Sequence, residues 1–140
     1  MSEEVRITDP VTGGQKGSKI ARFDLIPPDA LWALAEHYGK GAEKYADRNY
    51  EKGYKWGLSV ASLQRHLHQW LMGESVDPET GTNHLIAVAW HAFALFIFEL
   101  RGLGTDDVRL KGASQSSTPQ PLPVASQIKS LLGTTTYTGL

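Results

Sequence analysis

The chain has 140 residues, a net charge of −1 and no cysteine. This length is enough for one domain and short for two, and a hydrophobic share of 41% allows a real core. The balanced charge gives no sign of a nucleic-acid partner, although local basic clusters stay open. Without cysteine there is no disulfide and no thiolate metal site, so any metal ion must be held by carboxylate or imidazole groups.

The sequence also carries no clear targeting or membrane segment. Residues 1–10 contain acids and no apolar run, so we expect no signal peptide. The longest apolar stretch, residues 85–100, is interrupted by His91 and Glu99 and is shorter than the ~20 residues that a membrane span needs. We therefore expect a cytoplasmic protein with no membrane partner.

The polar segment 1–23 predicts an extended arm or a flexible loop. After Pro27 and Pro28, which suit a helix start, apolar residues recur at spacings of three and four and predict an amphipathic helix. These residues are Leu31, Leu34, Ala35, Tyr38, Ala42 and Tyr45. Gly39 and Gly41 interrupt the stripe at a cost of up to about 1 kcal/mol each, so we expect a kink or a close backbone approach there.

Two further helices are predicted downstream. A charged, aromatic-rich loop at 47–57 precedes a helix over 59–72, which Gly73 ends. The turn at 74–81 leads to a third helix over 83–101. This helix is apolar almost all round, which is typical of the central helix of a bundle or of a subunit interface.

The predicted architecture is therefore an all-α bundle over 24–111, with a polar arm at 1–23 and a tail at 112–140 rich in Ser, Thr, Gly and Pro. We expect the tail to be flexible or packed on a neighbouring subunit. Three helices make a marginal monomer, so we expect a homodimer or, in preference, a homotetramer. The residues expected to face outward on the third helix are Trp90, Phe93, Phe96, Ile97 and Phe98.

Four acidic residues are candidate metal ligands. Glu74, Asp77 and Glu79 share one tight turn and can converge on Mg²⁺ or Mn²⁺, which prefer oxygen ligands. The alternative is a solvated turn, since Asp-Pro and Glu-Thr-Gly are ordinary turn sequences. Glu36 lies beside the apolar stripe of the first helix, and its alternative is an ion pair with Lys40 one turn on.

Histidines are concentrated in the second and third predicted helices, at His66, His68, His84 and His91. His84 and His91 share a face but lie about 10.5 Å apart along the axis, so they cannot bind one ion. A lone histidine on a packed helix is more often a hydrogen-bonded core residue than a ligand.

Basic residues cluster in the arm, around the loop and on the second helix: Lys16, Lys19, Arg22, Lys44, Arg48, Lys52, Lys55 and Arg65. Arginine forks and lysine charges suit phosphate oxygens. The interleaved aromatic residues Tyr45, Tyr50, Tyr54 and Trp56 could stack on a base, and the alternative is a solvated surface loop. P-loop, GxSxG, HExxH and zinc-finger patterns do not occur in the sequence.

Three motifs are specific in combination: GAxKYxxRN at 41–49, RHLxxW at 65–70, and GExxDPExG at 73–81 followed by His84. Through them, residues 16–101 resemble a family of phage dATP/dGTP diphosphohydrolases of the MazZ type, related to MazG-like all-α nucleotide pyrophosphohydrolases. The resemblance implies an oligomeric bundle that cleaves the α–β bond of a purine deoxynucleoside triphosphate with two or three Mg²⁺ or Mn²⁺ ions. In phages that replace adenine by 2-aminoadenine, such an enzyme would supply dGMP.

The resemblance also implies a site. Its catalytic residues would be Glu36, Glu74, Asp77 and His84, and its metal ligands Glu36, Glu74, Asp77 and Glu79. Substrate binding would come from Lys19, Arg22, Lys44, Tyr45, Arg48, Asn49, Arg65 and Trp70. The chain departs from the family pattern in having no ExxE string, and in carrying Ala87 and Tyr50 where a histidine and a tryptophan are usual.

Two other classes of protein stay open at this point. A regulatory module that binds nucleotides without cleaving them would use the same residues. A structural helical phage protein would need none of the carboxylates.

Overall fold

The computed structural model describes residues 4–111. The chain divides into an N-terminal unit, described over residues 4–27, and a helical unit that begins at Pro28. The expected tail at 112–140 lies outside the described residues.

The N-terminal unit contains a β-hairpin, where the sequence analysis expected an extended arm or a flexible loop. Strand β1 (Val5–Thr8) pairs antiparallel with β2 (Gln15–Ser18). In the turn between them, one carboxylate oxygen of Asp9 accepts hydrogen bonds from the amides of Val11 and Thr12, both at 2.8 Å. This side-chain turn, together with the β-branched run in β1, is the signal that predicts a hairpin. A 3₁₀ turn, η1 (Phe23–Leu25), follows the hairpin.

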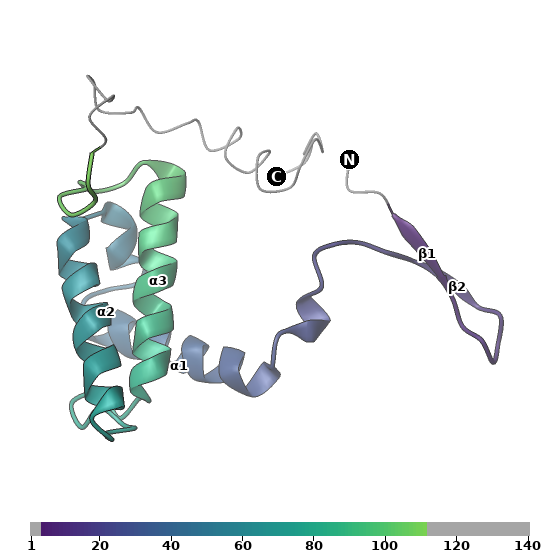
Figure 1. The fold of residues 1–140 in the computed structure, drawn as a ribbon, viewed down its shortest axis with the longest axis horizontal. Helices are drawn as coiled ribbons and strands as arrows, with labels where there is room; N and C mark the ends of the chain where they lie inside the picture. The colour runs from purple at the N-terminus through teal and green to yellow at the C-terminus, as the bar shows by residue number, and fades with distance from the viewer. Residues whose placement is uncertain (1–3, 112–140) are drawn as a thin grey trace. The chain divides into compact units, whose positions relative to one another are not determined.

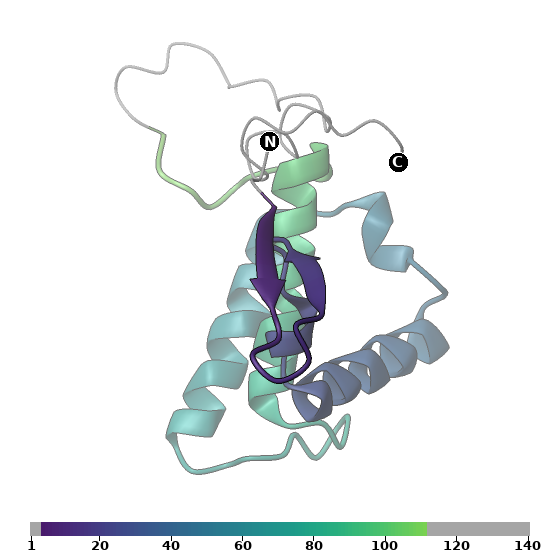
Figure 2. The same ribbon diagram turned by 90° about the vertical axis from the view of Figure 1, so that its right-hand side faces the viewer.

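The helical unit confirms the three predicted helices. They are α1 (Pro28–Lys44), α2 (Trp56–Leu71) and α3 (His84–Arg101), with a 3₁₀ turn η2 (Asn49–Lys52) between the first two. Helices α2 and α3 lie side by side, and α1 crosses α3 at a large angle (Figures 1 and 2). The all-α expectation therefore holds for this unit.

Helix α1 begins at Pro28, as expected, and continues through Gly39 and Gly41 to Lys44. A Cβ atom built on either glycine would meet nothing within 4 Å. The expectation of a close backbone approach at these glycines is therefore wrong.

Helix α2 begins at Trp56, three residues before the predicted start. The indole Nε1 of Trp56 donates to the carbonyl of Leu103 at 2.9 Å. The amide of Gly57 donates to the Asp107 carboxylate at 2.8 Å, which supplies an acceptor for a free N-terminal amide of the helix. Because this partner lies 50 residues downstream, the local sequence carries no capping signal.

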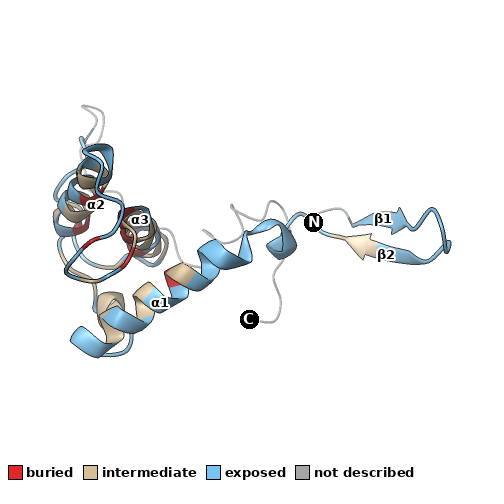
Figure 3. Ribbon diagram, turned by 90° about the horizontal axis from the view of Figure 1, so that it is seen from below, coloured by how far each residue is buried: buried red, intermediate tan, exposed pale blue. Residues whose placement is uncertain are grey.

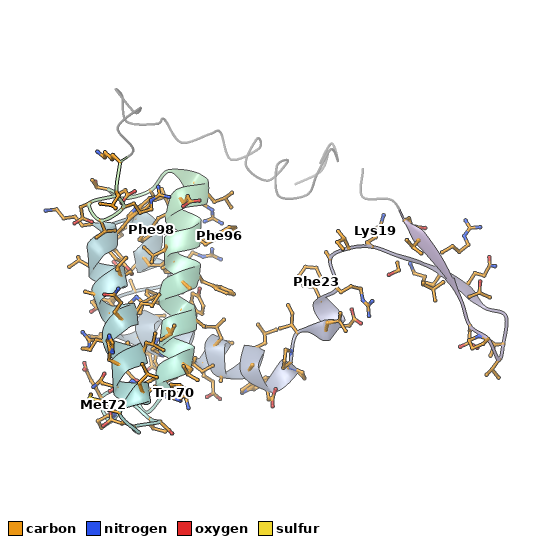
Figure 4. All side chains as sticks on the ribbon, viewed as in Figure 1. Lys19, Phe23, Trp70, Met72, Phe96 and Phe98 are labelled. Atoms are coloured by element: carbon orange, nitrogen blue, oxygen red, sulfur yellow. The ribbon has the colours of Figure 1, made fainter. Side chains whose placement is uncertain are left out.

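The core lies where α2 and α3 face each other (Figure 3). Ala94 and Phe98 of α3 are fully buried and pack with Trp56. Phe98 was expected to face outward, which is wrong, whereas Phe93 and Phe96 are about half exposed. Figure 4 shows Phe96 on the other side of α3 from Phe98.

Helix α3 is long and apolar enough to cross a membrane by length and composition, alone among the described helices. Core helices of globular proteins pass the same test, and α3 packs against both α1 and α2.

Candidate functional site

The turn between α2 and α3 fixes the position of Asp77. The amide of Asp77 donates to the carbonyl of Thr82 at 2.9 Å, and its carbonyl accepts from the amide of Gly81 at 2.7 Å. Its carboxylate accepts from the amide of Glu79 at 3.0 Å and from the hydroxyl of Thr80 at 3.2 Å. These bonds hold the carboxylate of Asp77 in one orientation, buried from solvent.

Lys40 joins this turn to helix α1. Its ammonium group donates to the carbonyl of Thr80 at 2.8 Å and to the hydroxyl of Thr82 at 3.3 Å. Glu36, its alternative partner, instead accepts from the indole of Trp32 at 2.9 Å. Lys40 therefore links α1 to the turn, and the alternative considered for Glu36, an ion pair with Lys40, does not form among the described residues.

Three buried side chains from α2, the turn and α3 converge. His66, Asp77 and His84 each offer one possible ligand atom, and these atoms lie within 4.8 Å of one another. His66 and His84 are close because α2 and α3 pack side by side over most of their length. Two imidazoles and one carboxylate at such distances can hold a metal ion.

The protons of the two histidines can be assigned from their partners. The Nε2 atom of His84 lies 2.7 Å from a carboxylate oxygen of Glu74, so this nitrogen carries the proton. In the neutral form of His84, its Nδ1 then has a lone pair and accepts from the Nδ1 of His66 at 2.8 Å. Burial is the main cause that lowers the pKa of His66, which favours its neutral form.

This arrangement fits a metal ion. Two Nδ1 atoms 2.8 Å apart must share either a proton or a cation, and a carboxylate on the far nitrogen of a ligating histidine is the usual support of such a ligand. His37 of α1 adds a buried Nδ1 without a hydrogen-bond partner, the one such side-chain atom among the described residues. Burial and the neighbouring His66 lower the pKa of His37, while Asp77 acts in the opposite direction.

The triad borders a cavity of about 900 Å³, a size that suits a nucleotide-sized ligand. His66 and Asp77 lie on its wall, together with the cations Lys40, Lys44, Arg48 and Arg65. The aromatic rings of Tyr38, Tyr50 and Trp90 also line it and pack edge to face or tilted, with centroids 5.6–5.9 Å apart. The cavity thus joins positive charge, aromatic surface and metal-ligating groups.

A second polar cluster lies on the same wall. The hydroxyl oxygens of Tyr54 and Ser59 are 2.5 Å apart, and the Ser59 oxygen lies 3.0 Å from the Nδ1 of His91. Ser59 is fully buried. Burial lowers the pKa of His91 to about 4, with a further contribution from His66, so its ring is neutral at pH 7.

The structure brings some of the predicted site residues together. Asp77 and His84 belong to the triad, and Glu74 supports it through His84. Glu79 lies on the cavity wall and pairs with Lys44 at 3.6 Å. The predicted substrate-binding residues that line the cavity are Lys44, Tyr45, Arg48, Asn49 and Arg65.

Four predicted residues are not brought together with the triad and its cavity. Glu36 and Trp70 are not among the residues that line the cavity, and Trp70 lies near the end of α2 (Figure 4). Lys19 pairs with Glu4 at 3.4 Å, and Arg22 forms a fork with Asp24, with contacts of 2.8 Å and 2.6 Å. Both basic residues belong to the N-terminal unit.

Sequence reasoning named His66 and His91 but gave neither a role in the site, and it did not single out His37. Each was open to interpretation as a core residue, because no pair of them lies on one helix at ligand spacing. The available signal was that three different helices each contribute a histidine to apolar faces that must meet in the core.

The family comparison agrees with this geometry. The model of the family described as dATP/dGTP diphosphohydrolase, N-terminal, matches residues 10–108. The chain belongs to this family. The matched segment contains the triad, the cavity and the Tyr54–Ser59–His91 cluster, and the family description indicates a hydrolase that acts on nucleoside triphosphates. Neither a curated protein nor a solved structure matches the chain.

Proposed function

We propose that the protein hydrolyses dATP and dGTP to the deoxynucleoside monophosphate and pyrophosphate, with a divalent metal ion, in the cavity of the helical unit. The observation that carries this proposal is the buried triad of His66, Asp77 and His84 beside a cavity with four cationic side chains on its wall. Cleavage of a phosphate anhydride depends mainly on positioning and on neutralising charge, with little covalent help from the protein.

His66, Asp77 and His84 would hold the ion. A ligand set with two nitrogens suits Mn²⁺ better than Mg²⁺, which prefers oxygen ligands, so of the two expected cofactors we favour Mn²⁺. When bound, the ion would supply Lewis-acid charge for the phosphate and for water. This set replaces Glu36, Glu74 and Glu79 by two histidines and keeps Asp77 from the sequence-based set.

The remaining groups would bind and orient the substrate. Glu74 holds the ring of His84 through Nε2, which leaves Nδ1 free to act as a ligand. Lys44, Arg48 and Arg65 would neutralise the triphosphate, because charged hydrogen bonds to phosphate oxygens are the strong ones. The rings of Tyr38, Tyr50 and Trp90 offer a stacking surface for a purine.

The test compares pyrophosphate release from dGTP by the full-length protein with Mn²⁺, with Mg²⁺ and with a chelator. His66→Ala and Asp77→Asn should each lower the rate at least about 100-fold, because the first removes one ligand of a three-ligand site and the second replaces its only anionic ligand by a neutral amide. His68→Ala is the matched control, since His68 is exposed on the same helix and lies outside the triad. Full activity of both triad variants, or full activity with chelator, would contradict the metal site. Binding of dGTP without pyrophosphate release would instead indicate a regulatory module.

We also propose the biological setting that the resemblance implies. In it, the protein is a cytoplasmic, phage-encoded homo-oligomer of MazG-like type whose dGMP product feeds the synthesis of 2-aminoadenine nucleotides. This proposal rests on family membership and on the three sequence motifs.

A further inference from the structure

The Tyr54–Ser59–His91 cluster is a hydrogen-bond chain whose direction can reverse. In one direction, Tyr54 donates to Ser59, and Ser59 donates to the Nδ1 of His91, which places the ring proton on Nε2. In the other direction, His91 donates from Nδ1 to Ser59, and Ser59 donates to Tyr54, which leaves Nε2 as a lone pair. Either hydroxyl can be the donor at the first contact, and the tautomer of His91 sets the second. The Tyr54–Ser59 and Ser59–His91 hydrogen bonds are therefore both kept in either direction.

The free end of this chain is available to a ligand. The Nε2 of His91 makes no hydrogen bond with the described residues. Because the one buried side-chain atom without a partner among these residues is the Nδ1 of His37, the Nε2 of His91 is accessible from outside the core. His91 itself lines the cavity. Reversal of the chain therefore changes the group that the cavity wall offers, from a donor to an acceptor, without moving a heavy atom.

The position of His91 suits a base better than a phosphate. Its ring lies edge to face with Trp90, centroids 4.9 Å apart, next to the aromatic surface formed by Tyr50 and Trp90. Its centroid lies 6.1 Å from that of His66 in the triad, so a nucleotide with its phosphates at the triad can reach His91 with its base.

We infer that His91, with Ser59 and Tyr54 behind it, contacts the 6-position of the purine and accepts both adenine and guanine by switching tautomer. The two bases differ at this position, because the amino group of adenine donates and the oxygen of guanine accepts. A fixed donor would discriminate strongly between them, since a mismatched base would leave a polar group unpaired. This inference rests on the proposed function and names the residues that set its base specificity.

The direct test observes the tautomer. Full-length protein labelled with ¹⁵N-histidine is bound to analogues of dATP and dGTP that carry a methylene group between the α- and β-phosphates. Two-bond ¹H–¹⁵N spectra distinguish protonated from unprotonated ring nitrogens, and His91→Gln identifies the His91 signals. We expect the proton on Nδ1 with the dATP analogue and on Nε2 with the dGTP analogue. The same tautomer with both analogues would overturn the inference, as would the absence of any change in the His91 signals on binding.

A variant tests the same inference through selectivity. In Tyr54→Phe the hydroxyl of Ser59 loses one acceptor and keeps, among the residues that the structure describes, only the Nδ1 of His91. The ring of His91 is then held with its proton on Nε2. We expect the ratio of kcat/KM for dGTP to that for dATP to rise roughly three- to tenfold, the range of one neutral hydrogen bond. Tyr50→Phe is the control for this ratio, because Tyr50 lines the same cavity but its hydroxyl contacts Glu51. An unchanged ratio in folded Tyr54→Phe would overturn the inference.

Failure of the inference and failure of the proposed function are separable. If wild-type protein releases pyrophosphate from both purine nucleotides and the His91 tautomer is the same with both analogues, only the inference fails. If wild-type protein releases no pyrophosphate, the proposed function fails, whatever the spectra show.

Discussion

The cationic side chains around the cavity differ in what surrounds them. Arg48 has a left-handed backbone conformation with φ of 58° and contacts Glu51 at 3.2 Å, whereas Arg65 makes no salt bridge with the described residues. Both line the cavity wall. A left-handed φ is uncommon outside glycine and is often kept at binding loops, which agrees with a role of Arg48 in holding substrate.

Arg48→Ala and Arg65→Ala should each lower kcat/KM for dGTP about tenfold. The effect follows from the loss of a charged hydrogen bond, about 1.5 kcal/mol at the lower end of its range because both side chains are exposed. Steady-state kinetics with Lys52→Ala as the control measures this, since Lys52 is basic and exposed but not on the cavity wall. Wild-type kinetics in both arginine variants would show that the phosphates bind elsewhere.

The candidate site was predictable in part at this scale. Asp77, His84 and Arg65 are marked by local motifs, and a motif is visible in one stretch of chain. His66 lies in the RHLxxW motif, but like His37 and His91 it meets its partners across helices. That proximity depends on which helix faces pack together. Glu36 was predicted as a metal ligand, but its carboxylate accepts a hydrogen bond from the indole of Trp32 on the same helix.

At the scale of elements, residues 103–105, which follow α3, pack against residues 54–56 at the start of α2. The backbone of Gly104 approaches Tyr54 so closely that a Cβ atom on Gly104 would lie 2.2 Å from the Tyr54 carbonyl oxygen, and Gly104 has φ of 68°. Thr105 continues this contact through a bridge with Lys55. The position of Tyr54 therefore depends on Gly104, which lies 50 residues further along the sequence. The hydrogen bonds of the Tyr54–Ser59–His91 cluster depend on Gly104 in turn.

Gly104→Ala should lower the free energy of unfolding by about 2 kcal/mol or more, from backbone strain and from the clash with Tyr54. Gly39→Ala is the matched control in α1, where the new methyl group meets open space and removal of a helical glycine should stabilise by up to about 1 kcal/mol. Urea denaturation followed by circular dichroism measures both. Equal stability of the two variants would contradict the close contact between the segments.

The elements themselves were largely predictable, because Pro28, Gly73 and Gly102 mark helix ends in the local sequence. The start of α2 was not, since its supporting contacts come from Leu103 and Asp107. The hairpin at 5–18 carried a readable signal in Asp9 and the β-branched residues. The segment 1–23 is polar and contains several glycines, and this composition led to the prediction of an extended arm or a flexible loop instead of a hairpin.

At the scale of the whole molecule, the exposed apolar side chains favour self-association. In the helical unit, Leu31, Trp32, Phe93 and Phe96 are each about half exposed or more. Exposed apolar surface beyond a few hundred Å² usually marks an interface. The expected oligomer remains a prediction, and these residues are the ones that its interface would cover.

Light scattering at micromolar concentration should give a mass of two or four times the chain mass of 15.4 kDa. The double variant Phe93→Ser/Phe96→Ser should shift this mass toward the monomer, because both rings lie on the exposed face of α3. Leu110→Ser is the control, since Leu110 is exposed but lies beyond the helices. A wild-type mass of 15.4 kDa with full activity would refute the oligomer.

The proposed reaction is cleavage of the bond between the α- and β-phosphates of purine deoxynucleoside triphosphates. The most direct measurement is product analysis after incubation of the full-length protein with dGTP or dATP and Mn²⁺ in ¹⁸O-labelled water. We expect pyrophosphate and a deoxynucleoside monophosphate that carries the label, because water would attack at the α-phosphorus. A diphosphate with free phosphate, a nucleoside with triphosphate, or intact substrate would contradict the account.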